Sequence, residues 1–486
     1  MIGFTKATEN YGLIGHVANG KSKTAEYLSK RKTNVDTRES KQGITMKTNY
    51  ADCLICKDPS KASPDCYFTV PTDSSKIGGV PVKRISLLDC PGHSDYMKFM
   101  FNGTNAMDKA IVVMSVEHEH MPAPQTIEHL TVIKEMGIPL IAVLVNKCDN
   151  ISPHDIESYL HKAADVIEKM GFPSIPIIPT CANLGVNLDV LLEVIVNSST
   201  PDTKDHLAPV MSCIRSFDHN TGRVPIEKMI GGTIGGTISS GTFSLEDDIM
   251  IYPGVVQPNR SSSSKWKYIP LSTKIVSMMA ERSKLEKAGS GGLVAMGTLL
   301  DPSLTTKDCL VGSIVVKKDD EYSKPHVYES IYLVDIIIGS KYDSIGIDKK
   351  NFMLEEKDNV VVNSNAQQIS ANIKKIYRKK DLSTMESAIR DLLKDDFVKD
   401  DKEKKCDKDD KDDKDEEKFF DSDDDSDNED NEDEDDENII LVEVEFTSAP
   451  LCAPDRCTVS ISKKIGRHGV RLVGHGAIKS GKESIQ

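Results

Sequence analysis

The stretch GHVANGKS, residues 15–22, decides the fold of the first part of this 486-residue chain. It fits the pattern G-x-x-x-x-G-K-[ST], follows the apolar run YGLI and precedes the helix-like stretch TAEYLSK. Glycines let backbone N–H groups close around phosphate oxygens, the Lys21 ammonium neutralises those oxygens, and the Ser22 hydroxyl can ligate Mg²⁺. The residues of this loop predicted to bind a nucleotide are Gly15, Val17, Ala18, Asn19, Gly20, Lys21 and Ser22.

Two further polar signatures follow apolar runs. DCPGH ends the run ISLLD, which places the Asp89 carboxylate near a metal ion and the Gly92 N–H where a γ-phosphate would be sensed. NKCD ends the run LIAVLV with Asn146, Lys147 and Asp149, and the last carboxylate suits the paired N–H donors on one edge of guanine. Each signature alone is compatible with ordinary turn chemistry. Three in this order favour a guanine nucleotide, because adenine would leave that polar edge unpaired.

The spacing of apolar runs predicts three domains, at residues 1–200, 201–320 and 321–486. From Gly12 to about Asn197, short apolar runs alternate with amphipathic stretches, which indicates a parallel sheet covered on both faces. Ligands of such sheets bind beyond the carboxyl ends of the strands. After about Thr200, glycines punctuate short β-rich pieces and predict a small barrel, and a third strand-rich segment follows.

The net charge of −15 belongs to one segment. Residues 400–437 hold 24 acidic and 7 basic side chains, a local −17 that leaves about +2 for the rest of the chain. We expect a disordered acidic insertion from about residue 395 to 437, because such a run repels itself and buries almost nothing. The nearly neutral remainder is compatible with RNA binding through local basic patches.

Apolar content and cysteine usage favour a cytoplasmic protein. No window approaches the roughly 18 apolar residues of a membrane helix, and the start, MIGFTKATENYGL, lacks the apolar stretch of a signal peptide. The eleven cysteines show no disulfide framework and indicate reduced thiols. We therefore expect no membrane partner.

With these motifs the sequence resembles the translational GTPases, whose second switch also reads DCPGH. The resemblance implies that residues 39–45 form the first switch. It implies that Thr45 binds Mg²⁺ and the γ-phosphate in the GTP state, so that the metal ligands are Ser22, Thr45 and Asp89. It further implies that the backbone of Cys181 and Ala182 contacts the base. The catalytic residue it implies is His93, which would position the attacking water.

Within that family the chain is more similar to the gamma subunits of translation initiation factor 2 than to elongation factor Tu, in NGTNAMD, PAPQTIEHL, IRSFDHN, GGTIGGTISSG and GRHGVRLVGHGAIKSG. The resemblance implies an α/β P-loop GTPase domain followed by two β-barrel domains. It implies GTP, GDP and Mg²⁺ as ligands, with methionyl initiator tRNA, alpha and beta subunits, the small ribosomal subunit, a GTPase-activating protein and a nucleotide-exchange factor as partners. The alternatives are an elongation-type carrier of aminoacyl-tRNA and a nucleotide-binding scaffold without turnover.

Two further expectations concern zinc and tRNA. Cys53, Cys56 and Cys66 fall where this family often carries a four-cysteine zinc knuckle, but three thiols leave a tetrahedral site incomplete, so we expect a degenerate knuckle without zinc. Tyr50 is a candidate for stacking on the aminoacylated end of the tRNA, with a buried tyrosine beside the first switch as the alternative. Residues 456–482 hold seven basic and no acidic residues, which suggests either a solvated face or an RNA contact.

Overall fold

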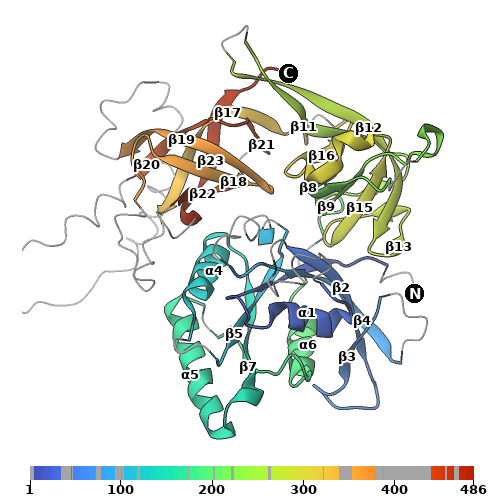
Figure 1. Cartoon of the computed structure of the whole chain (residues 1–486), viewed down its shortest axis with the longest axis vertical. Coiled ribbons are helices and arrows are strands. Elements are labelled where there is room, and N and C mark those ends of the chain that lie inside the picture. The colour runs from blue at the N-terminus through green and yellow to red at the C-terminus, as the bar shows by residue number, and fades with distance from the viewer. Residues whose placement is uncertain are drawn as a thin grey trace, which may run out of the picture.

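The structure is a computed structural model that describes residues 5–33, 45, 48–72, 78–93, 100, 103–104, 106–117, 121–172, 174–200, 203–220, 224–260, 264–320, 322–338, 353–378, 387, 439–454, 457–464 and 470–486. The predicted fold class is confirmed: an α/β domain is followed by two closed β-barrels. In Figure 1 the two barrels lie side by side above the α/β domain. No helix in the described ranges is both long and apolar enough to cross a membrane.

The first domain is built on a seven-stranded sheet of order β3-β2-β4-β1-β5-β6-β7. The strands from β4 to β7 in this order pair in parallel, whereas β2 and β3 run antiparallel at one edge. The sheet is therefore mixed and not wholly parallel as the apolar runs suggested. Its elements are β1 (Glu9–Ile14), α1 (Lys21–Ser29), β2 (Asn49–Lys57), β3 (Tyr67–Val70), β4 (Val80–Asp89), β5 (Lys109–Ser115), α4 (Pro124–Glu135), β6 (Leu140–Asn146), α5 (Pro153–Lys169), β7 (Ile177–Pro179) and α6 (Leu188–Asn197).

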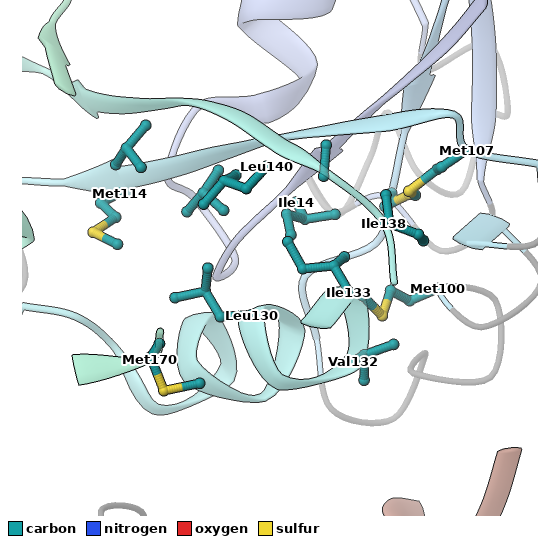
Figure 2. Packing of buried hydrophobic residues seen from close by; sticks show 14 of the residues in the cluster. Ile14, Met100, Met107, Met114, Leu130, Val132, Ile133, Ile138, Leu140 and Met170 are labelled. Carbon is teal, nitrogen blue, oxygen red and sulfur yellow. The ribbon is translucent and has the colours of Figure 1, made fainter. Parts of the chain in front are cut away.

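Helices cover both faces of this sheet, as predicted. Figure 2 shows one face, where Ile14 of β1 and Met114 of β5 pack against Leu130 and Ile133 of α4. On the other face α1 and α6 bury leucines against the opposite side of the same strands. Alternate residues of a strand point to opposite faces, so a strand covered on both sides reads as an unbroken apolar run. Both α4 and α5 start with a proline in the first turn, where its missing N–H costs nothing.

The first barrel closes because β11 pairs with both β16 and β12. Its interior is apolar, with Phe243, Ile249 and Met296 fully buried. Its six principal strands are β8 (Val210–Phe217), β9 (Thr233–Ser240), β11 (Asp248–Pro258), β12 (Trp266–Ala280), β15 (Leu293–Thr298) and β16 (Ile314–Lys317). The short strands are β10 (Phe243–Ser244), β13 (Ser283–Lys284) and β14 (Lys287–Ala288).

The second barrel closes through the pairing of β17 with β20. An apolar cluster that includes Tyr252, Ile314, Val327 and Cys452 joins the two barrels. The strands are β17 (His326–Ile338), β18 (Asn359–Ser364), β19 (Gln367–Arg378), β20 (Ile439–Phe446), β21 (Leu451–Ala453), β22 (Thr458–Lys464) and β23 (Val470–Glu483).

The predicted acidic insertion joins two neighbouring strands of the second barrel. β19 ends at Arg378, β20 begins at Ile439, and these two residues are paired in the antiparallel ladder. The segment of about 395–437 lies outside the described residues. Because the ladder holds Arg378 next to Ile439, the barrel closes independently of what connects these two residues.

Deletion of residues 400–437 should therefore leave the fold intact. We expect the free energy of unfolding to change by less than about 1 kcal/mol, because shortening a loop recovers closure entropy only logarithmically. Urea titration followed by circular dichroism measures this. Val444→Asp, which places a charge in the buried face of β20, is the destabilised control. A fall in the midpoint comparable to that control would show that the segment is part of the barrel.

Candidate functional site

A cavity of about 500 Å³ opens at the carboxyl ends of the parallel strands, where the sequence signatures converge. This size falls within the usual range for small-molecule sites. It is lined by Val17, Ala18, Gly20, Lys21, Ser22, Lys23, Thr45, Gly92, Glu117, Asn146, Lys147, Asp149, Asn150, Cys181, Ala182 and Asn183.

The loop between β1 and α1 wraps around the Lys21 side chain. Gly15 and Gly20 have φ angles of 135° and 99°, a region that other residues rarely enter. The Lys21 ammonium donates to the carbonyl oxygens of Gly15 and His16, both at 2.8 Å. Burial lowers the pKa of Lys21 to about 8, partly offset by the nearby Asp89 carboxylate. A phosphate beside this ammonium would favour its charged form.

Gly92 lies against the same loop. A Cβ atom at this position would come within 2.5 Å of Lys21 Nζ and 2.7 Å of the Gly15 carbonyl oxygen. Only glycine fits, because the backbone of the DCPGH stretch is packed onto the phosphate loop. His93 follows directly and is half-buried. The two signatures are thus in contact although 66 residues, 23–88, separate them.

The three predicted metal ligands lie near Lys21: Ser22 and Thr45 line the cavity, and the Asp89 carboxylate is close to the Lys21 ammonium without lining it. Ser22 Oγ is 3.0 Å from Thr45 Oγ1, and the fully buried Asp89 accepts a hydrogen bond of 3.0 Å from Thr33 Oγ1 through Oδ2. All donors of this set are oxygens, including one carboxylate, which is the ligand chemistry that Mg²⁺ prefers. These residues therefore fit a magnesium ion.

Asn146 holds three loops together. Its amide group donates to the Asn19 carbonyl oxygen at 2.8 Å and accepts from the Ala182 N–H at 2.9 Å. Asn19 in turn donates through its side chain to the Val113 carbonyl oxygen at 2.7 Å. Both asparagines are buried. Their amides organise the cavity and link its phosphate side to its far side.

Asp149 lies in the short 3₁₀ helix Cys148–Asn150 on that far side. Glu117, two residues after β5, forms an ion pair with Lys147 and accepts from Asn150 Nδ2 at 2.6 Å. Burial raises the pKa of the Cys181 thiol, and its hydrogen bond to the Asp149 carboxylate raises it further. The thiol therefore contacts the proposed base reader, whereas the sequence suggested only a main-chain role for this residue.

Most of the predicted ligand-binding residues line the cavity, but Gly15, Asn19, Asp89 and His93 do not. The first two support the loop from behind, as described above. The lining residues that sequence reasoning missed are Lys23, Glu117, Asn150 and Asn183. Lys23, Asn150 and Asn183 each directly follow a predicted residue, so adjacency is a signal that could have found them. Nothing in the sequence marks Glu117.

The three cysteines of the predicted knuckle are not brought together. Cys53 and Cys56 lie on β2, three residues apart and on opposite faces of the sheet, so they cannot ligate one ion. Cys66 lies at the base of the following hairpin loop, where its carbonyl oxygen accepts from the Asp58 N–H at 2.8 Å. Among the described side chains, no cluster of three or more His, Cys, Asp or Glu could hold a metal ion.

The two candidate RNA contacts, Tyr50 and the basic stretch 456–482, lie in different surroundings. Tyr50 is half-buried on β2. Burial raises the pKa of its hydroxyl, and the nearby charges of Arg215 and Asp308 of the first barrel also influence that pKa. Tyr50 therefore lies where the two domains meet. In the basic stretch 456–482, three cations are already paired with carboxylates. These are Lys463, Arg471 and Lys482. Carboxylates from outside the stretch therefore offset part of its positive charge.

Helix α4 connects the second barrel to the phosphate loop. Arg471 of β23 forms a buried ion pair of 2.8 Å with Glu128, whose pKa burial raises to about 7 against the opposing guanidinium. The next residue, His129, accepts from the Gly15 N–H through Nδ1 at 3.0 Å. Burial lowers the pKa of His129 to about 3, so this ring is neutral and can accept.

The sheet order, the phosphate loop and the guanine-side residues define a P-loop GTPase of the translational class. In agreement, residues 6–201 match the family described as the elongation factor Tu GTP binding domain. The chain is 37% identical over 309 residues to the translation initiation factor 2 subunit gamma of Methanococcus maripaludis, which covers 63% of this chain and 74% of that protein.

Two further relatives agree. The subunit gamma of Methanocaldococcus jannaschii is 35% identical over 342 residues, 69% of this chain and 81% of that protein. The eukaryotic translation initiation factor 2 subunit 3 of Drosophila melanogaster is 34% identical over 367 residues, 72% and 76% respectively. The chain belongs to the translation initiation factor 2 gamma subunit family, and it is a GTPase.

Solved structures of elongation factor SelB share the fold. The Methanococcus maripaludis protein in complex with a GTP analogue aligns over 99% of this chain and 80% of its own length, with a TM-score of 0.64 and 19% identity. A bacterial selenocysteine-specific elongation factor gives a TM-score of 0.62 at 15% identity, over 97% of this chain and 58% of its own length. At these identities the likeness concerns architecture alone.

Asp149→Asn should weaken GTP binding and shift preference toward xanthosine triphosphate. The amide donates where the carboxylate accepted, and an unpaired polar group costs on the order of 1–3 kcal/mol. Competition binding with both nucleotides measures the shift. Cys181→Ser, which retains a donor beside the same carboxylate, is the matched control and should keep guanine preference. Unchanged GTP affinity in Asp149→Asn would remove this loop as the base reader.

Proposed function

We propose that this chain is a GTP-dependent carrier of methionyl initiator tRNA to the small ribosomal subunit, working in the cytoplasm with alpha and beta subunits. The observation that carries the proposal is the 34–37% identity to gamma subunits of initiation factor 2 over most of the chain. An elongation-type carrier is the alternative, and the SelB structures share the fold with this chain at no more than 19% identity.

The cavity supports nucleotide binding in two halves. Lys21 and the phosphate-loop N–H groups would hold the phosphates, and Asp149 would read guanine. Ser22, Thr45 and Asp89 would hold magnesium, which when bound supplies positive charge to the phosphate oxygens. Thr45 lies 23 positions after Ser22 in the chain, so the contact between their hydroxyls would hold the end of the first switch at the site. Loss of the γ-phosphate would remove the partner of Thr45 and Gly92 and relax both switches.

Hydrolysis requires a positioned water. In phosphoryl transfer the protein does little covalent work, so its contribution is clamping of the phosphates and orientation of the nucleophile. Gly92 lies on the phosphate loop, and the next residue along the chain is His93. A backbone that senses the γ-phosphate would thereby also deliver the imidazole toward the attacking water. The release of tRNA would follow hydrolysis.

The tRNA role is tested by binding to methionyl initiator tRNA and to elongator methionyl tRNA, each with GTP and with GDP. We use the chain assembled with its alpha and beta partners. We expect the initiator tRNA to bind at least about tenfold more tightly in GTP than in GDP, a difference of roughly 1.4 kcal/mol. Equal binding of both tRNAs would favour an elongation-type carrier. GTP turnover without any tRNA binding would contradict the carrier function.

His93→Ala should retain binding of GTP and initiator tRNA but lose hydrolysis. Removal of the ring affects the barrier more than the bound state, and loss of one positioning group commonly costs about 10²-fold or more in rate. Single-turnover hydrolysis with small ribosomal subunits and the activating protein measures the loss. Cys90→Ser, a change in the same DCPGH stretch, serves as control. Wild-type hydrolysis in the His93 variant would demote it to a structural residue.

A further inference from the structure

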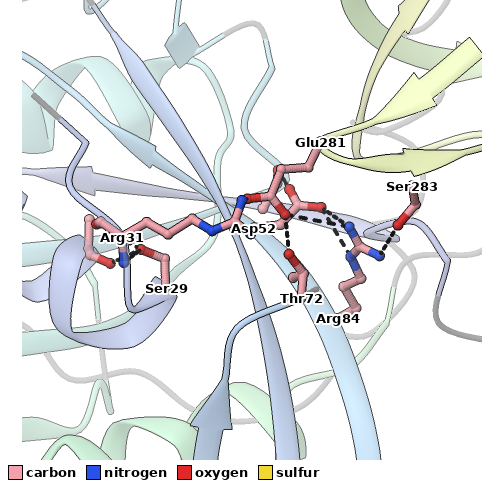
Figure 3. Close-up of polar contacts among 9 residues, drawn as sticks. Ser29, Arg31, Asp52, Thr72, Arg84, Glu281 and Ser283 are labelled. Atoms are coloured by element: carbon pink, nitrogen blue, oxygen red, sulfur yellow. Dashed lines mark hydrogen bonds and ion pairs between the residues drawn. The ribbon is translucent and has the colours of Figure 1, made fainter. Parts of the chain in front are cut away.

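A carboxylate of the first barrel reaches into the GTPase domain. Glu281 accepts hydrogen bonds from Arg31 Nη1 and Thr72 Oγ1, and the Arg84 guanidinium lies 3.8 Å away. Figure 3 shows these side chains converging from both domains. Arg84 is itself fixed by the Asp52 carboxylate, with hydrogen bonds of 3.1 and 2.8 Å. The contact is partly buried, so its charges are screened by water less than those of a surface pair.

The turn that carries Glu281 is built from an unfavourable residue. Ala280 of β12 pairs with Ser283 of β13, which leaves a two-residue turn between the strands. Glu281 has a φ of 54° in this turn, where glycine, asparagine or aspartate is usual. A left-handed conformation costs most residues roughly 1–2 kcal/mol. Conformations of this kind persist where the surroundings enforce them, and here the enforcing contacts lie in the GTPase domain.

Arg31 connects Glu281 to the magnesium side of the cavity. It lies two residues after the end of α1, and its backbone N–H donates to Ser29 Oγ at 3.3 Å. Two residues further on, Thr33 donates to the Asp89 carboxylate at 3.0 Å. The next segment, 34–44, lies outside the described residues and ends at Thr45, whose hydroxyl is 3.0 Å from Ser22. Thr33, which precedes the first switch, is therefore bonded to Asp89, and Thr45 at its end is bonded to Ser22. On the Thr33 side, Arg31 is also bonded to Glu281 of the barrel.

We propose that Glu281 is a positioning residue for GTP, which holds the entry to the first switch through Arg31 so that Thr45 can meet the γ-phosphate. This inference rests on the proposed role of Thr45. The carboxylate touches neither nucleotide nor metal, so its effect passes through the Arg31 to Asp89 connection. Because the γ-phosphate is absent from GDP, the contact favours GTP over GDP. Through this contact, the preference for GTP over GDP depends on how the first barrel packs against the GTPase domain.

The test compares dissociation rates of fluorescent GTP analogue and GDP from the full chain. Glu281→Ala should speed release of the triphosphate by roughly 5- to 20-fold, the usual size of coupling between sites, with GDP release changed less than about twofold. Glu281→Gln keeps the shape and an acceptor for Thr72, and is expected to fall between wild type and Glu281→Ala. Arg31→Ala combined with Glu281→Ala should be no worse than either change alone. Lys284→Ala, an exposed lysine of the same hairpin, should leave both rates unchanged.

Thr45→Ala separates the two hypotheses. Faster triphosphate release in Thr45→Ala but not in either Glu281 variant would overturn this inference and leave the proposed site standing. No selective effect in Thr45→Ala would contradict the proposed role of Thr45 and with it this inference. Equal acceleration of GTP and GDP release in both Glu281 variants would also overturn it, because general support of the fold does not distinguish the nucleotides.

Discussion

The nucleotide site depends on one buried amide. Asn146 lies at the end of a central strand and bonds to the phosphate loop on one side and to Ala182 on the other. A buried amide left without partners costs more than the bonds it makes contribute, so all three loops are fixed relative to one another. The two hydrogen bonds of Asn146 set the distance between the Lys21 end and the Asp149 end of the cavity. The residues that would contact phosphate and base can then be chosen for chemistry, because the scaffold behind them is already determined.

Each barrel contacts the GTPase domain through a charged pair, and the two contacts meet different parts of the site. Glu281 of the first barrel lies at the entry to the first switch. Arg471 of the second barrel pairs with Glu128 of α4, which directly precedes the histidine that bonds Gly15. The apolar cluster between the barrels makes them neighbours of each other as well. Both barrels therefore contact the part of the GTPase domain that carries the nucleotide site, and each of the three domains contacts the other two.

The sequence predicted what local patterns determine. Gly20, Gly92 and Lys21 line the cavity, as do Asn146, Lys147 and Asp149 of the Asn-Lys-x-Asp stretch, because their chemistry leaves few alternatives. The C-x-x-C spacing of Cys53 and Cys56 looks the same in a loop as in a strand, and only the ladder places the two thiols on opposite faces. The antiparallel edge of the sheet, Glu117 beside Lys147, and the Glu128–Arg471 pair across 343 residues depend on tertiary packing. No local pattern encodes such contacts.

The hydrogen bond between the Gly15 N–H and His129 is insensitive to pH near neutrality. With a pKa of about 3, the His129 ring is neutral from about pH 5 to 8, so Nδ1 remains an acceptor throughout that range. A surface histidine in the same place would titrate near neutrality and would release the loop as the medium became more acidic. Burial thus converts a residue type often used as a proton sensor into a fixed hydrogen-bond acceptor, and its contact with the Gly15 N–H does not change with pH in that range.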